Sequence, residues 1–249
     1  MLTTMDVDRP PVALAECQWI VFDAVGTLIQ PNPSVATAYH TIAARHGSQL
    51  TLAEVGERFR RSFRESESKT FDGSHTPTSH WISNDKIERA RWEWIVRQVV
   101  HDVSDIQACF GELWEHFARP SSWSTFADVQ PTLQALRDAG FHLAIASNFD
   151  SRLHAVCQQN EALKNIERWF VSSETGSRKP APEFYAAVIK KCGCRAQQIL
   201  MIGDDPEHDV VGPIKAGLQA LLIDRRLADQ TSGSLSTLLQ IVPQVSRAV

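Results

Sequence analysis

The chain lacks the features typical of membrane proteins and of nucleic-acid-binding proteins. No run approaches the ~18 consecutive apolar residues that a membrane-spanning helix needs, although 43% of the 249 residues are hydrophobic. Lys and Arg number 25 against 29 Asp and Glu, a net charge of -4, so no basic surplus is available to hold a polyanion. The sequence therefore predicts a soluble protein that binds neither nucleic acid nor a membrane.

Cysteine is scarce as well. The five cysteines are odd in number, and Cys192-Gly193-Cys194 lacks the spacing of a redox or zinc-binding Cys-x-x-Cys motif. Residues 1–16 have neither the basic start nor the long apolar stretch of a secretory signal. We therefore expect reduced thiols and a cytoplasmic protein.

What the chain does contain is a set of short apolar runs that end in polar or acidic residues. They cover residues 19–23, 142–147, 199–204 and 219–224. The first and third are almost wholly apolar, which is typical of parallel strands covered on both faces. Helical patterns at 129–139, 182–191 and 209–216 alternate with the later runs. This order predicts an α/β sandwich whose ligands lie beyond the carboxyl ends of the strands.

Residues 34–117 interrupt this alternation with helical periodicity and no convincing strand. The length of the chain allows one large or two modest domains. We predict a core formed by 1–33 and 118–249 and a helical insertion at 34–117, joined by linkers at 30–33 and 119–124, where prolines and serines gather. Residues 71–85, rich in Gly, Ser, Thr and His, are expected to form a long loop.

Asp23 stands at the end of the first run, in Asp23-Ala24-Val25-Gly26-Thr27-Leu28. An aspartate at the tip of a buried strand, followed by a glycine that permits a sharp turn, can present its carboxylate as a nucleophile. On its own it is more typical of a turn-capping residue.

Two further elements carry groups that suit an anion. Ser147-Asn148 ends the second run, where a hydroxyl and an amide can donate hydrogen bonds, although many strands end this way for turn reasons. Lys179, in Arg178-Lys179-Pro180-Ala181-Pro182, can lie beside the nucleophile and neutralise a phosphate; the alternative is a solvated loop lysine.

The turn after the third run is the most informative, with four carboxylates in Gly203-Asp204-Asp205-Pro206-Glu207-His208-Asp209. These acids repel one another unless a cation or a helix N-terminus compensates them. Oxygen ligands without a nearby cysteine point to a hard ion, Mg²⁺. Acids that cap a helix without any metal are the alternative.

These four elements, in this order, resemble the haloacid dehalogenase superfamily over residues 19–224. Ser147-Asn148-Phe149-Asp150, followed by Arg152-Leu153, and the segment 117–123 resemble its little-characterised "haloacid dehalogenase-like hydrolase domain-containing" branch. The resemblance implies a Rossmann-like three-layer sandwich with a parallel sheet, and a helical cap made by 34–117. Such a cap would move as a unit over the site.

The resemblance also implies a Mg²⁺-dependent hydrolase of a small phosphorylated metabolite. Asp23 would attack phosphorus to form an aspartyl-phosphate, which water would then hydrolyse. The metal would be held by Asp23, Asp204 and the carbonyl of Val25, with Asp209 or Asp205 as a further acidic group. Ser147, Asn148 and Lys179 would bind the phosphate oxygens.

Val25 departs from the pattern of the family's phosphatases, which carry a second aspartate at this position as general acid and base. Valine transfers no proton, and such a loss typically lowers the rate about 10²- to 10⁴-fold. We therefore expect alkyl phosphates to be poor substrates and phosphates with good leaving groups, aryl or acyl, to suffer least.

Two other functions remain open. The family's 2-haloacid dehalogenases begin Asp-Ala-Tyr-Gly-Thr-Leu, close to residues 23–28 here, and halide leaves without a proton. Against this, Asp204 and Asp205 place negative charge where those enzymes use neutral residues. The third possibility is a binding or regulatory protein with an inactive site.

Substrate choice in this family depends largely on the cap, where the sequence says little. His75, His80 and Trp81 lie in the expected loop and are interpreted as solvated residues, with access to the site as the alternative. Four tryptophans are expected to pack between helices rather than to stack on a ligand: Trp92, Trp94, Trp114 and Trp123.

Overall fold

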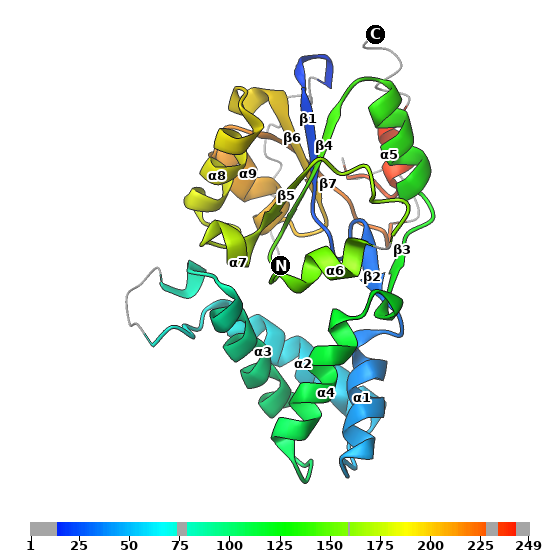
Figure 1. Cartoon of the computed structure of the whole chain (residues 1–249), viewed down its shortest axis with the longest axis vertical. Coiled ribbons are helices and arrows are strands. Elements are labelled where there is room, and N and C mark those ends of the chain that lie inside the picture. The colour runs from blue at the N-terminus through cyan, green and yellow to red at the C-terminus, as the bar shows by residue number, and fades with distance from the viewer. Residues whose placement is uncertain (1–13, 74–78, 159, 228–233, 243–249) are drawn as a thin grey trace, which may run out of the picture.

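The computed structural model describes residues 14–73, 79–158, 160–227 and 234–242, and shows a sheet with flanking helices above a group of four helices (Figure 1). Five strands form the sheet in the order β5-β4-β1-β6-β7, and every neighbouring pair is parallel. The strands are β1 Trp19–Phe22, β4 His142–Ser147, β5 Arg168–Val171, β6 Ile199–Gly203 and β7 Gln219–Leu222. The α/β class and the parallel sheet predicted from the sequence are confirmed.

Helices cover both faces of this sheet. Alternate residues of each strand point to opposite sides, so Ile20 and Phe22 enter one apolar cluster while Trp19 and Val21 enter the other. The first cluster includes side chains of α5 Val129–Asp138, α6 Arg152–Gln158 and the 3₁₀ turn Leu238–Ile241. The second is packed against α8 Pro182–Cys192, beside which lies α9 Gly212–Lys215. The central strands are therefore buried on both faces, as their uninterrupted apolar runs require.

Two elements of the core differ from the prediction. Strand β5, followed by the short helix α7 Ser172–Thr175, was not predicted, because this four-residue edge strand begins at the exposed Arg168 and has no apolar run of its own. The helix predicted at 209–216 is instead a π-helical turn, Glu207–Val211, followed by α9. Pro213 has no N–H to continue the helical register across this point.

The insertion is made of α1 Val35–Arg45, α2 Leu52–Glu67, α3 Asp85–Val99 and α4 Ile106–Ala118. Each helix begins after a side chain that accepts a hydrogen bond from a backbone N–H of its first turn: Ser34, Thr51, Asn84 and Asp105 respectively. Their apolar faces share a cluster separate from those of the sheet, with Tyr39, Ile95 and Leu113 fully buried. Within the described residues, no helix is both long and apolar enough to cross a membrane.

The two segments predicted as linkers, 30–33 and 119–124, overlap a pair of short strands. Strand β2 Ile29–Pro31 pairs antiparallel with β3 Trp123–Thr125, so the outgoing and returning chains are fastened side by side. The predicted loop at 71–85, as far as it is described, contains the 3₁₀ turn Ser79–Trp81 and a bridge from Ile82 to Ser177 of the core.

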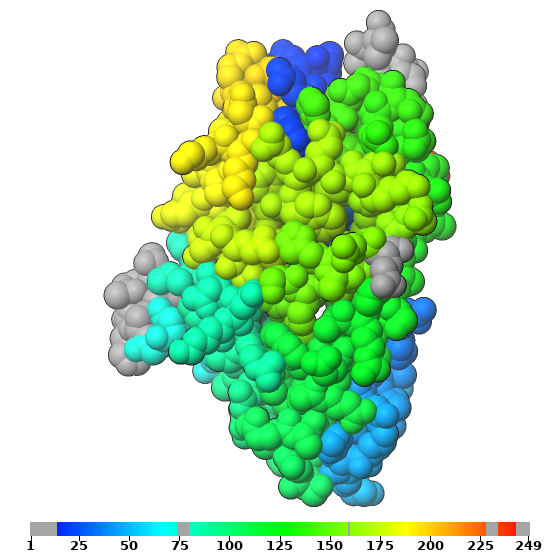
Figure 2. All heavy atoms as spheres, viewed as in Figure 1, coloured from blue at the N-terminus to red at the C-terminus, as the bar shows by residue number. Residues whose placement is uncertain are grey.

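Further contacts join the insertion to the carboxyl edge of the sheet; in Figure 2 the insertion lies below the atoms of the α/β core. Asp85, at the start of α3, accepts hydrogen bonds from the backbone N–H of Ser151 at 2.9 Å and from its hydroxyl at 2.7 Å. Arg152 donates to the carbonyl of Trp114 at 3.0 Å and lies over its ring. The helical insertion is thus held against the sheet edge where the predicted site residues lie.

Candidate active site

Three of the predicted motifs meet at one edge of the sheet because their strands are neighbours. Asp23 follows β1 in the centre, Ser147 ends β4 on one side, and Asp204 follows β6 on the other. The carboxyl ends of parallel strands lie at the same edge, so residues far apart in sequence come together there.

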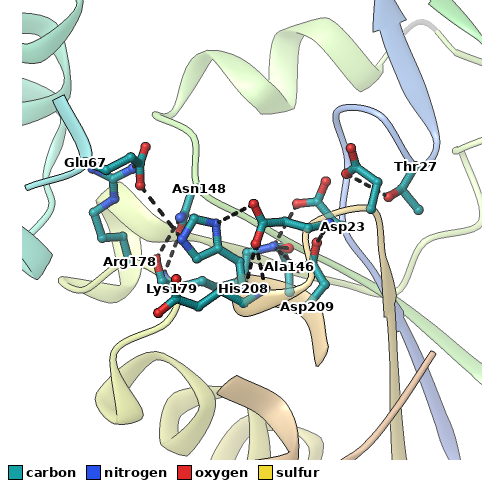
Figure 3. Close-up of polar contacts among 12 residues, drawn as sticks. Asp23, Thr27, Glu67, Ala146, Asn148, Arg178, Lys179, His208 and Asp209 are labelled. Carbon is teal, nitrogen blue, oxygen red and sulfur yellow. Dashed lines mark hydrogen bonds and ion pairs between the residues drawn. The ribbon is translucent and has the colours of Figure 1, made fainter. Parts of the chain in front are cut away.

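Lys179 is the centre of the group (Figure 3). Its Nζ donates hydrogen bonds to Asp23 Oδ1 at 2.8 Å, to Asp209 Oδ1 at 2.6 Å and to the carbonyl of Ala146 at 2.9 Å. The lysine is 2% exposed and both carboxylates are buried. Burial alone lowers the pKa of Lys179, but Asp209 and Asp23 outweigh it and raise the pKa above its ordinary value. A cation is therefore fixed beside the predicted nucleophile.

Asn148 holds the lysine in place. Its side-chain amide donates to the carbonyl of Lys179 at 2.9 Å, and its Oδ1 accepts from the backbone N–H of Lys179 at 2.7 Å. These two bonds fix the backbone of Lys179, so the amide group of Asn148 is already engaged. Ser147 and Asn148 both line the cavity described below, although Ser147 is only 2% exposed.

The acidic turn brings a second and a third carboxylate to Asp23. One oxygen each of Asp23, Asp204 and Asp209 lies within 4.8 Å of the others. Burial, followed by the negative charge of Asp23, raises the pKa of Asp204 to about 7. Burial likewise raises the pKa of Asp209 to about 7, although Lys179 opposes it. The three groups therefore lack enough positive charge for full ionisation, and a bound cation would supply it.

Two glycines make room for these carboxylates. A Cβ at Gly203 would lie 2.2 Å from the carboxyl carbon of Asp209, and one at Gly26, whose φ is +92°, would lie 2.3 Å from Asp204 Oδ2. Asp205 has a different role, because its Oδ1 accepts from the backbone N–H groups of Glu207 and His208. Asp209, and not Asp205, is therefore the acid that joins Asp23 and Asp204.

A cavity of about 450 Å³ opens in front of this group, between the sheet edge and the insertion. Asp23, Val25 and Lys179 form part of its floor. Aromatic side chains form much of the rest: Tyr39, Phe59, Phe63, Trp92, Phe110, Trp114, Phe117, Trp123 and Phe149. Three of the four tryptophans expected only to pack between helices therefore line the cavity too, and Trp94 is the exception.

A charged wall of this cavity was not predicted. Glu67, at the end of α2, forms ion pairs with Arg91 of α3 and, at 3.1 Å, with Arg178 of the core, and its Oε2 lies 3.8 Å from His208 Nε2. Burial alone raises the pKa of Glu67, but Arg91 and Arg178 outweigh it and lower the pKa. In the sequence, the only signal was that Arg178 and His208 stand next to Lys179 and Asp209.

The predicted loop residues do not join the site. His80 and Trp81 do not line the cavity, and Trp81 contributes instead to a separate, smaller pocket. His75 lies outside the described residues.

Comparisons with known proteins identify the family of the chain. The sequence model of the haloacid dehalogenase-like hydrolases matches residues 17–217. The chain is 24% identical to the haloacid dehalogenase-like hydrolase domain-containing protein 3 of Danio rerio, over 86% of this chain and 88% of that protein. It is 29% identical to the ribulose-1,5-bisphosphate 5-phosphatase of Halopiger xanaduensis, over 41% of this chain and 43% of that protein. A defluorinating L-2-haloacid dehalogenase has a similar fold, with a TM-score of 0.71 and 18% identity over 92% of this chain and 95% of that one.

The buried lysine network generates a stability prediction. Replacing Lys179→Met removes the cation between Asp23 and Asp209, and leaving buried charges without a partner costs about 3 kcal/mol. Lys179 opposes the rise in the pKa of Asp209, so its removal raises that pKa further and makes ionisation of the folded chain more costly as pH rises. The decrease in the free energy of unfolding caused by Lys179→Met should therefore be larger at pH 8 than at pH 5, as measured by urea unfolding in EDTA.

Lys190→Met is the matched control, since Lys190 is exposed on α8. It should change the free energy of unfolding by less than about 0.5 kcal/mol. An equal loss in both variants, or a loss in Lys179→Met that does not depend on pH, would contradict the assigned network.

Proposed function

Because the chain belongs to the haloacid dehalogenase-like hydrolase family, we propose that it hydrolyses phosphate monoesters with Asp23 as the nucleophile. The observation that carries this proposal is the position of Asp23 on the cavity floor, with a buried lysine 2.8 Å from one of its oxygens. Lys179 places a cation beside the carboxylate and contributes the positive charge that a phosphoryl group requires.

The proposed reaction has two steps on Asp23. A carboxylate oxygen attacks phosphorus, the bond from phosphorus to the ester oxygen breaks, and that oxygen leaves with the bonding electrons. Water then attacks the phosphorus of the aspartyl-phosphate and loses its proton, which releases inorganic phosphate and restores the carboxylate. Lys179 and the hydroxyl of Ser147 bind phosphate oxygens in both steps.

Asn148 was predicted to bind phosphate as well. We propose that it acts mainly through its two hydrogen bonds to the backbone of Lys179, which set the direction of the ammonium group.

A divalent metal fits the acidic group. The three carboxylate oxygens within 4.8 Å, the lack of a Cβ at Gly26 and Gly203, and the unbalanced negative charge all suit a small hard cation. We propose that Mg²⁺ is held by Asp23, Asp204 and Asp209 with the carbonyl of Val25. When bound, it would supply positive charge to the phosphoryl oxygens.

Val25 limits which esters react. It is half-buried and lines the cavity at the position from which a proton donor would act. The leaving oxygen must then depart without a proton from this residue, which favours stable oxyanions over alkoxides.

We also propose that residues 34–117 act as a cap over a core formed by 1–33 and 118–249. Support comes from the separate apolar cluster of α1–α4 and from the paired strands β2 and β3, which are suited to serve as a hinge. Closure of such a cap excludes bulk water from the phosphoryl group.

Dehalogenation is the second candidate, favoured by Val25 and by the apolar cavity. The acidic group argues against it, because Asp204 and Asp209 have no role in releasing halide and repel a carboxylate substrate. A panel of phosphate esters and a 2-haloacid, each assayed with and without Mg²⁺, separates the two. Binding of phosphate without turnover of either class would instead indicate a binding or regulatory protein.

Replacing Asp23→Asn should abolish phosphate release, because the amide removes the nucleophile at almost unchanged volume. The measurement is release of inorganic phosphate from aryl and acyl phosphates, with the melting temperature recorded as a check on folding. Asp138→Asn, an exposed change on α5, should keep wild-type turnover. Full activity in Asp23→Asn would refute the assigned nucleophile.

Mg²⁺ should raise the melting temperature more at pH 8 than at pH 5.5. Protons compete with the metal for Asp204 and Asp209, whose raised pKa values of about 7 leave both largely protonated at the lower pH. Mg²⁺ at 100 times its dissociation constant stabilises the folded chain by about 2.7 kcal/mol. Asp204→Asn should remove most of this shift, and an equal shift at both pH values would contradict the metal assignment.

Val25→Asp should raise kcat/KM for alkyl phosphates about tenfold or more, by restoring a proton donor, and should raise it less for aryl phosphates. Val25→Asn is the control, since it adds similar bulk and polarity but transfers no proton. A matching gain in Val25→Asn, or no gain on either class of ester, would show that something other than the missing acid limits turnover.

A further inference from the structure

We propose that the cavity binds phosphate monoesters whose leaving group is an uncharged aromatic ring system, and that it selects them over sugar phosphates and small acyl phosphates. This inference rests on the proposed phosphatase function and narrows it to a substrate class.

The first support is the surface that faces the phosphate site. Rings from three helices and a loop surround the space in front of Asp23: Phe59, Phe63, Trp92, Trp114, Phe117 and Phe149. Each of these is only half-buried, so the folded chain leaves aromatic surface open to the cavity. Phe59 stacks with Phe63 at 5.8 Å between ring centres, and Phe63 lies 6.0 Å from Trp92. A ligand ring would extend this series with offset or edge-to-face contacts.

The second support is the state of the charged groups on the same walls. Arg91 and Arg178 pair with Glu67, while Arg152 pairs with Asp150 and lies 3.3 Å over the ring of Trp114. Arg91 also lies 3.7 Å from Glu88, so these three guanidinium groups are paired with carboxylates of the protein, whereas Arg64, which also lines the cavity, is exposed to solvent. A sugar would give up hydrogen bonds to water on entering and would have to break these pairs to replace them.

The third support is Val25, which lines the same cavity two residues after Asp23. An apolar side chain at this point suits a leaving oxygen that needs no proton, and an aryl oxygen delocalises its charge into the ring. An acyl phosphate also has a good leaving group, a carboxylate, yet a small acyl group would fill little of a 450 Å³ cavity. The leaving-group chemistry and the shape of the cavity therefore favour the same class of ester.

The substrate test compares 2-naphthyl phosphate, phenyl phosphate, acetyl phosphate and a hexose 6-phosphate at saturating Mg²⁺. We expect KM to fall about tenfold from phenyl to naphthyl phosphate, in line with burial of the additional ring, and kcat/KM for both to exceed that for the hexose phosphate. Turnover of acetyl phosphate that equals or exceeds that of naphthyl phosphate overturns the aromatic class but leaves the phosphatase intact. Failure to release phosphate from all four overturns the proposed function itself.

Two tryptophans on helix α3 provide a matched pair of variants. Trp92 lines the cavity, whereas Trp94 lies outside it, 6.1 Å from Phe71 and 5.0 Å from the ammonium group of Lys69. Trp92→Leu should raise KM for 2-naphthyl phosphate about tenfold with no change for acetyl phosphate, and Trp94→Leu should change neither. Phe63→Leu, on the same wall, replaces Trp92→Leu if the latter does not fold.

A binding measurement tests the inference without turnover. Wild-type protein should bind naphthylmethylphosphonate, whose carbon–phosphorus bond is not hydrolysed, about tenfold more tightly than methylphosphonate by titration calorimetry. Trp92→Leu should abolish that difference. Equal affinity of the two phosphonates in the wild type, or the same loss in Trp94→Leu, would overturn the assignment of the rings to ligand binding.

Discussion

The ion network around Lys179 is the constraint on which the site depends. A lysine that is 2% exposed needs carboxylates at hydrogen-bond distance, and Asp23 and Asp209 provide them from two different loops. Those loops follow adjacent strands, so the network also ties β1 to the turn after β6. Gly203 is required because any side chain there would overlap Asp209. The folding of this edge of the sheet and the position of Asp23 thus depend on a single charged cluster.

The same segment links this network to the helical insertion. Arg178 pairs with Glu67 of α2, and the next residue, Lys179, pairs with Asp23. Two consecutive side chains therefore connect the insertion, through Glu67, to Asp23 on the floor of the cavity. A shift of α2 away from the sheet would break the bond from Glu67 to Arg178 and move the backbone that Asn148 also holds. We infer that closure over the cavity and alignment of Lys179 are mechanically coupled.

Much of the core could be predicted from the sequence because its strands are buried on both faces. Runs such as 199–204 contain little besides apolar residues, and their acidic ends mark the functional edge. Strand β5 could not be predicted, since an edge strand with an exposed arginine has no such run. The pairing of β2 with β3, and of Glu67 with Arg178, depends on contacts between distant segments that no local pattern records. For the same reason the tryptophans were interpreted as packing residues: helical spacing shows that Trp92 and Trp114 face inward but not that an open cavity lies there.

The lining of the cavity is of two chemically different kinds, and Val25 is part of it. On the floor, Lys179 and the carboxylates form a strongly polar site suited to a phosphoryl group and a cation. Beyond it, the rings of α2, α3 and α4 form a surface suited to an apolar group. A proton-transferring aspartate at position 25 would add a further negative charge to an acidic cluster that already holds Asp204 and Asp209 partly protonated. Valine avoids that repulsion and adds apolar surface to the cavity. The lack of a general acid is therefore consistent with a substrate whose leaving oxygen departs without a proton.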